Sequence, residues 1–252
     1  MPQPDTQRAI TRDRYDAVLL DLDGVITDTA SIHAACWKQM FDEYLQKRAT
    51  QRGEAFHPFD IATDYRLYVD GKPRYDGVRD FLASRRIQLP EGSPDDPPQA
   101  ETVDGLGNRK NDLVNKIIED KGVVRYEGSV KLVRQLRHQG FKIAVVTSSQ
   151  NCTAVLKAAK LDDCFDLQVD GNVIHAQHLA GKPAPDTYLM AAKLLGVEPA
   201  RAVVIEDALS GVEAGSNGKF GLVIGVARKR NADELRHHGA NLVVNDLGEL
   251  AD

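Results

Sequence analysis

Two aspartates, Asp21 and Asp23, directly follow the apolar run Ala17–Leu20, which is typical of a buried strand. Residues two apart in an extended segment point the same way, so both carboxylates would face one side. Gly24 comes next and allows a tight backbone path around a ligand. Alone, such a pair is more often a helix cap beside a solvated aspartate, so its meaning depends on what other strands bring to the same place.

Polar residues also follow two other predicted strands. The run Phe141–Val146 ends in hydroxyl side chains at Thr147–Ser149, which alone would usually cap a helix. The run Ala202–Ile205 ends in Glu206 and Asp207, a pair that commonly begins a helix. Ligands of open α/β sheets bind beyond the carboxyl ends of the strands, so we expect these groups to converge with the first aspartate pair.

The combined groups favour a phosphate site that contains a metal ion. Carboxylates side by side repel one another unless a cation is present, and their hard oxygens suit Mg²⁺. Lys182 precedes a predicted helix and adds an ammonium group. A lone lysine there would be a surface residue, but with the hydroxyl groups it suits a phosphate.

The carboxyl-terminal half of the chain alternates short apolar runs with helical patterns. The further predicted strands are Phe165–Val169, Gly221–Val226 and Asn241–Val244. This alternation is typical of a doubly wound parallel sheet, with Ala17–Leu20 as its first strand. We predict an α/β core domain with a Rossmann-like sheet, made of residues 1–33 and 126–252.

Residues 34–125 have a different pattern. Apolar side chains fall at helical spacing in Trp37–Leu45, and further helical patterns surround Val78–Leu82 and Leu113–Ile118. The proline-rich stretch Leu89–Gly107 predicts a surface loop. We interpret residues 34–125 as a mostly helical cap domain inserted after the first strand, where it could act as a lid.

Composition excludes several classes of function. The net charge of −5 offers no basic field for nucleic acid or an anionic membrane. No segment approaches the roughly 20 apolar residues of a membrane span. The three cysteines lack a CxxC spacing, and the first residues lack the apolar core of a signal peptide. We therefore expect a cytoplasmic monomer that binds neither nucleic acid nor membrane.

Four motifs occur in the order found in the haloacid dehalogenase superfamily of phosphotransferases. They are DLDGV (Asp21–Val25), VTSS (Val146–Ser149), GKPAPD (Gly181–Asp186) and IEDALSG (Ile205–Gly211). The resemblance covers nearly the whole chain. Within the superfamily the chain most resembles the β-phosphoglucomutase family, because His33 and RKND (Arg109–Asp112) also fall in register.

The resemblance implies an enzyme that works through an aspartyl-phosphate. Asp21 would be the nucleophile and Asp23 the general acid and base. The other catalytic residues would be Thr147, Lys182 and His33. Mg²⁺ would be held by Asp21, the backbone carbonyl of Asp23 and Asp207, with Glu206 assisting through water.

The resemblance also implies the residues that would bind a small phosphorylated sugar. They are Gly24, Thr29 at the hinge of the insert, Arg74, Lys110, Ser148, Ser149 and Asn151. Arg74 would hold a second phosphate together with Ser149 and Asn151, because a guanidinium donates two parallel hydrogen bonds to phosphate. The activity would be a mutase reaction that interconverts β-D-glucose 1-phosphate and glucose 6-phosphate through glucose 1,6-bisphosphate.

Other functions remain open at this point. Gln150 stands where the family pattern has a lysine, and the proline-rich loop is longer than in a compact cap, so a phosphatase of sugar phosphates or other small phosphate esters is the alternative. A non-catalytic receiver-like phosphoacceptor domain is more remote, since such domains lack a second aspartate at the position of Asp23 and have no inserted cap. Gly105–Gly107 falls in the predicted loop and is too short for a dinucleotide-binding motif.

Overall fold

A computed structural model describes residues 9–228 and 230–251. The N-terminal segment, which lacks the apolar core of a signal peptide, includes residues 1–8, and these lie outside the described residues. The chain divides into two compact units, a core unit (residues 1–28 and 123–252) and a cap unit (29–122). These divisions differ by a few residues from the expected 33/34 and 125/126, because a continuous helix begins at Ala30 and includes His33.

The core unit contains a six-stranded, fully parallel sheet with the strand order β3-β2-β1-β4-β5-β6. The predicted α/β class is confirmed, and the predicted strands are present within two residues of their expected starts. The strands are β1 (Ala17–Leu20), β2 (Lys142–Val146), β3 (Leu167–Val169), β4 (Ala202–Glu206), β5 (Leu222–Val226) and β6 (Leu242–Val244). The central strand β1 is wholly buried, which explains its unbroken apolar sequence.

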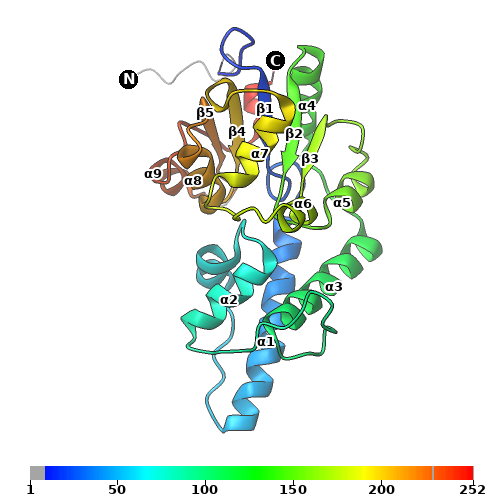
Figure 1. The fold of residues 1–252 in the computed structure, drawn as a ribbon, viewed down its shortest axis with the longest axis vertical. Helices are drawn as coiled ribbons and strands as arrows, with labels where there is room; N and C mark the ends of the chain where they lie inside the picture. Colours follow the sequence, from blue (N-terminus) through cyan, green and yellow to red (C-terminus); the bar gives the residue numbers. More distant parts are fainter. Residues whose placement is uncertain (1–8, 229, 252) are drawn as a thin grey trace. The chain divides into compact units, whose positions relative to one another are not determined.

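Helices cover both faces of this sheet. Figure 1 shows α7 (Asp186–Leu195) and α8 (Leu209–Asn217) beside the sheet. Tyr188 of α7 and Val212 of α8 share one buried cluster with Leu19, Val146 and Val204 of the strands. Helix α4 packs on β2 with its own buried apolar stripe. The helices of the core unit are α4 (Glu127–His138), α5 (Cys152–Ala158), α6 (Gly171–Ala176), α7 (Asp186–Leu195), η3 (Pro199–Arg201), α8 (Leu209–Asn217), α9 (Ala232–His237) and η4 (Leu247–Leu250).

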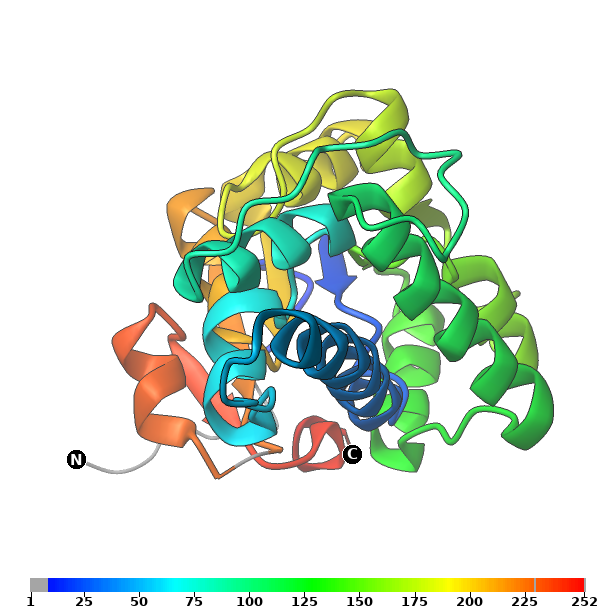
Figure 2. The ribbon, with the colours of Figure 1, turned by 90° about the horizontal axis from the view of Figure 1, so that it is seen from below.

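The cap unit is helical, as its apolar spacing predicts. Figure 2 looks nearly along the longest helix, α1, with the other cap segments around it. Phe41 of α1 lies at the centre of an aromatic cluster. The centroid of its ring is 5.3 Å from that of the stacked Trp37 ring and 4.1 Å from that of the Phe81 ring. The cap helices are α1 (Ala30–Arg52), η2 (Ile61–Val69, a π-helix), α2 (Arg74–Ser84) and α3 (Val103–Lys121).

The predicted surface loop Leu89–Gly107 is too long, because α3 already begins at Val103. The Thr102 hydroxyl accepts a hydrogen bond from the Gly105 N–H at 2.9 Å and caps this helix. A Cβ at Gly105 would lie 2.4 Å from the Ala100 carbonyl oxygen. Gly105, which falls in the predicted loop, therefore serves close packing inside a helix.

Two segments of the core unit connect to the cap unit, one leading into it and one returning from it. Backbone hydrogen bonds join these two segments to each other. The Asp28 N–H donates to the Val124 carbonyl at 2.8 Å, and Thr27 forms an antiparallel bridge with Arg125. Among the described residues no helix is long and apolar enough to cross a membrane.

The aromatic cluster predicts the effect of a truncation in the cap. Phe81→Ala should lower the free energy of unfolding of the cap by about 3–5 kcal/mol, because it leaves a cavity among stacked rings. Urea titration followed by the fluorescence of Trp37, the chain's single tryptophan, measures this. Phe56→Ala is the matched control, since Phe56 is 37% exposed and its loss should change stability by less than about 1 kcal/mol. Equal losses would contradict the described packing.

Candidate active site

Lys182 lies at the centre of the predicted site. Its ammonium group donates to Asp21 Oδ1 at 2.6 Å, to Glu206 Oε1 at 2.6 Å and to the Val146 carbonyl at 3.3 Å. These acceptors come from the carboxyl ends of β1, β4 and β2, which are neighbours in the sheet. The side chain of Lys182 is 1% exposed. A buried ammonium uses all three of its donors here, so it ties the ends of three strands together.

Glu206 is held by four hydrogen bonds. Its Oε2 accepts from the backbone N–H groups of Asp207 at 3.0 Å and Ala208 at 3.1 Å. Its Oε1 accepts from Lys182 and from the Tyr188 hydroxyl at 2.9 Å. With both oxygens occupied, Glu206 is fixed in place and in turn orients Lys182.

The first aspartate pair lies beside this group. The backbone N–H of Asp23 donates to Asp21 Oδ2 at 2.9 Å, and the Thr147 hydroxyl donates to Asp23 Oδ2 at 3.3 Å. Asp21 is buried, whereas Asp23 is half-buried. The two carboxylates therefore have different surroundings, with an ammonium beside Asp21 and a hydroxyl beside Asp23.

Burial shifts the protonation of the central pair. Burial raises the pKa of Asp21 well above its usual range, the nearby ammonium of Lys182 opposes this, and the neighbouring carboxylate of Glu206 adds to it. Burial alone would lower the pKa of Lys182, but the carboxylates of Asp21 and Glu206 outweigh it and raise that pKa well above its usual range. Lys182 is therefore the cationic member of this group.

Two glycines allow the carboxylates to approach the backbone. Gly24 has φ +89°, and a Cβ there would lie 2.3 Å from Asp207 Oδ2. A Cβ at Gly211 would lie 1.8 Å from Glu206 Oε1. Any side chain at either position would displace an acidic group of the site.

The loop after β2 is organised by its own hydroxyl groups. Thr147 Oγ1 accepts from the Ser149 N–H at 3.1 Å, and Ser149 Oγ accepts from the Asn151 N–H at 3.2 Å. Ser148 lies between them and is half-buried. The loop therefore curls at the end of β2, where Thr147 also reaches Asp23.

Asp21, Glu206 and Asp207 form a buried acidic cluster. One carboxylate oxygen from each lies within 4.8 Å of the others. When all three carboxylates are ionised, the single positive charge of Lys182 does not balance them. Such a set of oxygen donors can hold a cation.

In the cap unit, two of the predicted residues lie together. Lys110 Nζ lies 2.6 Å from His33 Nδ1 and 5.0 Å from the centre of the Trp37 ring. A charged Lys110 must donate to His33 Nδ1, which leaves the imidazole hydrogen on Nε2. The Trp37 ring face stabilises the buried ammonium.

Arg74 and Thr29 occupy the starts of helices in the cap unit. Arg74 begins α2, where its guanidinium donates to the Tyr75 hydroxyl at 3.1 Å and is half-buried. Thr29 precedes α1, is fully buried, and accepts from the His33 N–H at 2.9 Å through its carbonyl.

Sequence reasoning missed several supporting residues. Tyr188 is fully buried against Glu206 and Lys182, and its only sequence signal is its position two residues after the GKPAPD motif. Arg228 donates to the Gly24 carbonyl at 3.2 Å and stacks on Tyr126 at 3.7 Å. No motif marks Arg228, because its contacts join segments about 200 residues apart in the chain.

A family model for haloacid dehalogenase-like hydrolases matches residues 15–218. The chain belongs to this family. The resemblance seen in the motifs is thereby confirmed, and the protein is an enzyme of phosphoryl transfer or phosphate-ester hydrolysis.

Relatives of known name include both kinds of activity. The chain is 53% identical to a β-phosphoglucomutase of Mycobacterium tuberculosis, over 94% of this chain and 92% of that protein. It is 30% identical to the fructose-1-phosphate phosphatase YqaB of Escherichia coli, over 80% of this chain and 92% of that protein. A β-phosphoglucomutase structure from Clostridium difficile superposes with a TM-score of 0.73 at 25% identity, covering 94% and 93% of the two chains.

The close contact at Gly211 predicts a loss of activity on substitution. Gly211→Ala should reduce turnover of p-nitrophenyl phosphate by roughly ten- to a hundred-fold, because the new methyl group displaces Glu206 from Lys182. Alanine otherwise favours a helix by about 1 kcal/mol over glycine, so instability of α8 is not the expected cause. Ser216→Ala, at an exposed position of the same helix, is the control and should keep full activity. Full activity of Gly211→Ala would show that Glu206 need not be held there.

Proposed function

We propose that the protein is a Mg²⁺-dependent β-phosphoglucomutase. It would interconvert β-D-glucose 1-phosphate and glucose 6-phosphate through glucose 1,6-bisphosphate. The single observation that carries this proposal is the 53% identity to the mycobacterial β-phosphoglucomutase over nearly the full length of both chains. The geometry of the core unit supports the phosphoryl-transfer chemistry that the reaction requires.

The acidic cluster fits Mg²⁺ by the chemistry of its donors. Asp21 and Asp207 offer carboxylate oxygens, and Glu206 lies in the same cluster although its oxygens already accept hydrogen bonds. We assign Asp21, Asp207 and the backbone carbonyl of Asp23 as ligands, with Glu206 acting through water. The ion would offset negative charge on the transferred phosphoryl group.

Asp21 is the proposed nucleophile. Lys182 and the Asp23 N–H each bind one of its oxygens, so the carboxylate is fixed before substrate arrives. An Asp21 oxygen would attack phosphorus, form an acyl phosphate and release the sugar oxygen. Thr147, with the backbone of Ser148, would hold the phosphoryl oxygens, and Lys182 would do so in place of its 3.3 Å contact with the Val146 carbonyl.

Asp23 is the proposed general acid and base. It is half-buried and accepts a hydrogen bond from the Thr147 hydroxyl at 3.3 Å, whereas the Lys182 ammonium donates to Asp21. As an acid it would give its proton to the leaving sugar oxygen, and as a base it would take a proton from the hydroxyl that accepts the phosphoryl group. We assign His33 to orient Asp23 through its Nε2–H, with Lys110 fixing that tautomer.

The second phosphate separates a mutase from a phosphatase. We assign Arg74, Ser149 and Asn151 to bind the phosphate that is not being transferred, with Gly24 and Thr29 completing the substrate site. A hydrolase remains the second candidate, favoured by Gln150 and by the 30% identity to the fructose-1-phosphate phosphatase. The outcome depends on whether a sugar hydroxyl or water reaches the aspartyl-phosphate first.

One assay decides between the two candidates. The protein is incubated with β-glucose 1-phosphate, Mg²⁺ and a trace of glucose 1,6-bisphosphate, and glucose 6-phosphate and free phosphate are followed together. We expect glucose 6-phosphate to rise without a matching release of phosphate. Free phosphate in equal amount would identify a phosphatase instead.

The assigned roles predict how the two aspartates differ. Asp21→Asn should abolish both mutase turnover and aryl phosphate hydrolysis, because no nucleophile remains. Asp23→Ala should lower mutase turnover by about 10²- to 10⁴-fold, the usual contribution of an acid–base group. Thermal unfolding of Asp23→Ala should stay close to that of the parent protein. Normal turnover of Asp23→Ala would refute its acid–base role.

The assignment of Arg74 predicts a selective defect. Arg74→Ala should reduce mutase turnover by roughly tenfold or more, since a hydrogen bond to a charged group contributes about 1.5–3 kcal/mol. Hydrolysis of p-nitrophenyl phosphate, which has no second phosphate, should change little. Arg79→Ala on the same helix is the control, because Arg79 is exposed and pairs with Asp76 and Glu91. Equal losses in the two assays would exclude binding of a distal phosphate by Arg74.

A further inference from the structure

A pocket of about 370 Å³ lies wholly within the cap unit. This cap pocket is formed by the C-terminal part of α1, by the segment that follows α2, and by Glu101 just before α3. Its lining residues are Tyr44, Arg48, Gln51, Arg52, Arg86, Ile87, Gln88, Leu89 and Glu101. None of them has a role in the proposed mutase reaction.

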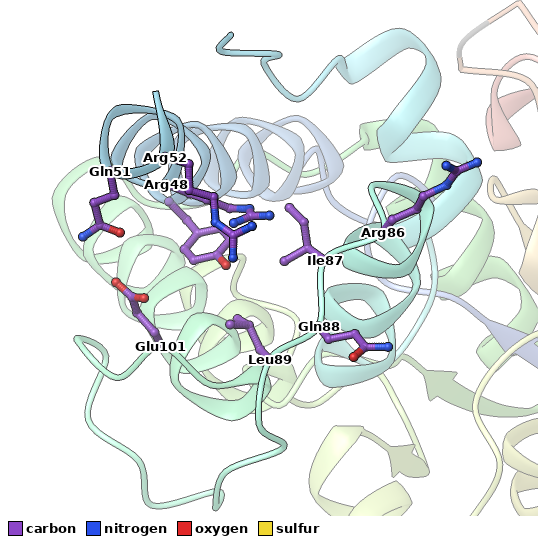
Figure 3. A pocket seen from close by; sticks show the side chains of 9 residues that line it. Arg48, Gln51, Arg52, Arg86, Ile87, Gln88, Leu89 and Glu101 are labelled. Carbon is purple, nitrogen blue, oxygen red and sulfur yellow. The ribbon is translucent and has the colours of Figure 1, made fainter. Parts of the chain in front are cut away.

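The two walls of the cap pocket differ in character. Tyr44, Arg48 and Arg52 are spaced four residues apart, so they share one face of α1. Figure 3 shows the side chains of Arg48 and Arg52 reaching from α1 into the hollow, with Ile87 and Leu89 across from them. The side chain of Arg86 points away from the centre in the same view. The pocket thus places two guanidinium groups opposite an aliphatic wall.

Neither guanidinium group has an anionic partner in the described part of the chain. The guanidinium groups of Arg48 and Arg52 form no hydrogen bond or ion pair with any residue that the structure describes. Glu101, the only carboxylate of the pocket lining, instead accepts from Lys47 Nζ at 2.5 Å. Like charges four residues apart destabilise a helix by about 0.2–0.5 kcal/mol, and a bound anion would reverse that repulsion.

The shape and donors of the pocket define the class of ligand. A guanidinium fork matches the oxygens of a phosphate, and two forks on one face can bind one dianion together. Burial raises the pKa of the Tyr44 hydroxyl, so this group is a neutral hydrogen-bond donor near pH 7. Ile87 and Leu89 offer apolar contact for a carbon skeleton, and the volume is within the range of small-molecule sites.

We propose that the cap pocket binds a small organic phosphate at a site separate from the active site, through Arg48 and Arg52 with the ligand's carbon body against Ile87 and Leu89. Arg48 lies fifteen residues after His33 in the same continuous helix, which corresponds to about 22 Å along α1. The ligand would join the end of α1 to the segment after α2 and so fix the far end of the helix that carries His33.

The test uses the full-length protein labelled with ¹⁵N and the non-hydrolysable probe phenylphosphonate. Amide resonances of Gly53 and Ile87 report on the cap pocket, and those of Gly24 and Thr147 report on binding at the active site. We expect the cap resonances to shift and saturate at millimolar probe. Absence of saturable shifts at Gly53 and Ile87 would overturn the proposal, whatever happens at Gly24 and Thr147.

Variants separate a built site from general attraction of anions. Arg48→Gln should weaken binding at the cap resonances by roughly tenfold or more and leave the shifts at Gly24 and Thr147 unchanged. Arg48 is preferred to Arg52, because a cation in the last turn of a helix is favourable without any ligand. Lys116→Gln is the control of equal charge, since Lys116 is exposed on α3 and does not line the pocket. Equal weakening by both variants would overturn the proposal.

A second probe tests the phosphate itself. Benzoate carries the same phenyl ring with a carboxylate in place of the phosphonate. We expect it to bind at least several-fold more weakly, as reported by the resonances of Gly53 and Ile87. A carboxylate carries a single negative charge and offers only two acceptor oxygens. Equal or tighter binding of benzoate would overturn the assignment to organic phosphates.

Discussion

The ammonium of Lys182, buried between Asp21 and Glu206, is the interaction on which the rest of the site depends. Its positive charge partly neutralises the buried acidic cluster at the carboxyl ends of the strands. Its hydrogen bonds link the ends of three neighbouring strands. Breaking a buried ion pair commonly costs about 3–5 kcal/mol, because the remaining charge is left uncompensated. The same contact that stabilises the core therefore also fixes the proposed nucleophile.

The supporting shell follows from this constraint. Tyr188 and two backbone N–H groups hold Glu206, and Gly211 leaves the space that its carboxylate fills. Gly24 does the same for Asp207. Each of these features restricts the conformations of a charged side chain before a ligand binds. A site fixed in this way can stabilise a developing charge without reorganising.

The core could be predicted from sequence because its signals are local. Apolar runs ending in polar residues located the strands, and parallel topology then required their ends to meet, as Asp21, Thr147 and Glu206 do. The expected strand Ala202–Ile205 needed only the addition of Glu206. The roles assigned to individual side chains remain predictions, since they concern chemistry with a substrate.

Other features could not be predicted, because they depend on contacts distant in sequence or on close packing. Arg228 reaches Gly24 from the other end of the chain. Gly105 suggested a loop, but the Ala100 carbonyl requires a residue without a side chain within α3. The π-helix η2 has no motif, and the cap pocket appears only when α1 and the Arg86–Leu89 segment are placed together.

The most direct test of the central claim is to find the phosphoryl group on the protein. The enzyme is mixed with ³²P-labelled glucose 1,6-bisphosphate and Mg²⁺, quenched in acid, and mapped by peptide. We predict label on the peptide that contains Asp21, and its release by hydroxylamine as expected for an acyl phosphate. Label on a serine, threonine or histidine, or turnover with no labelled peptide, would contradict the account.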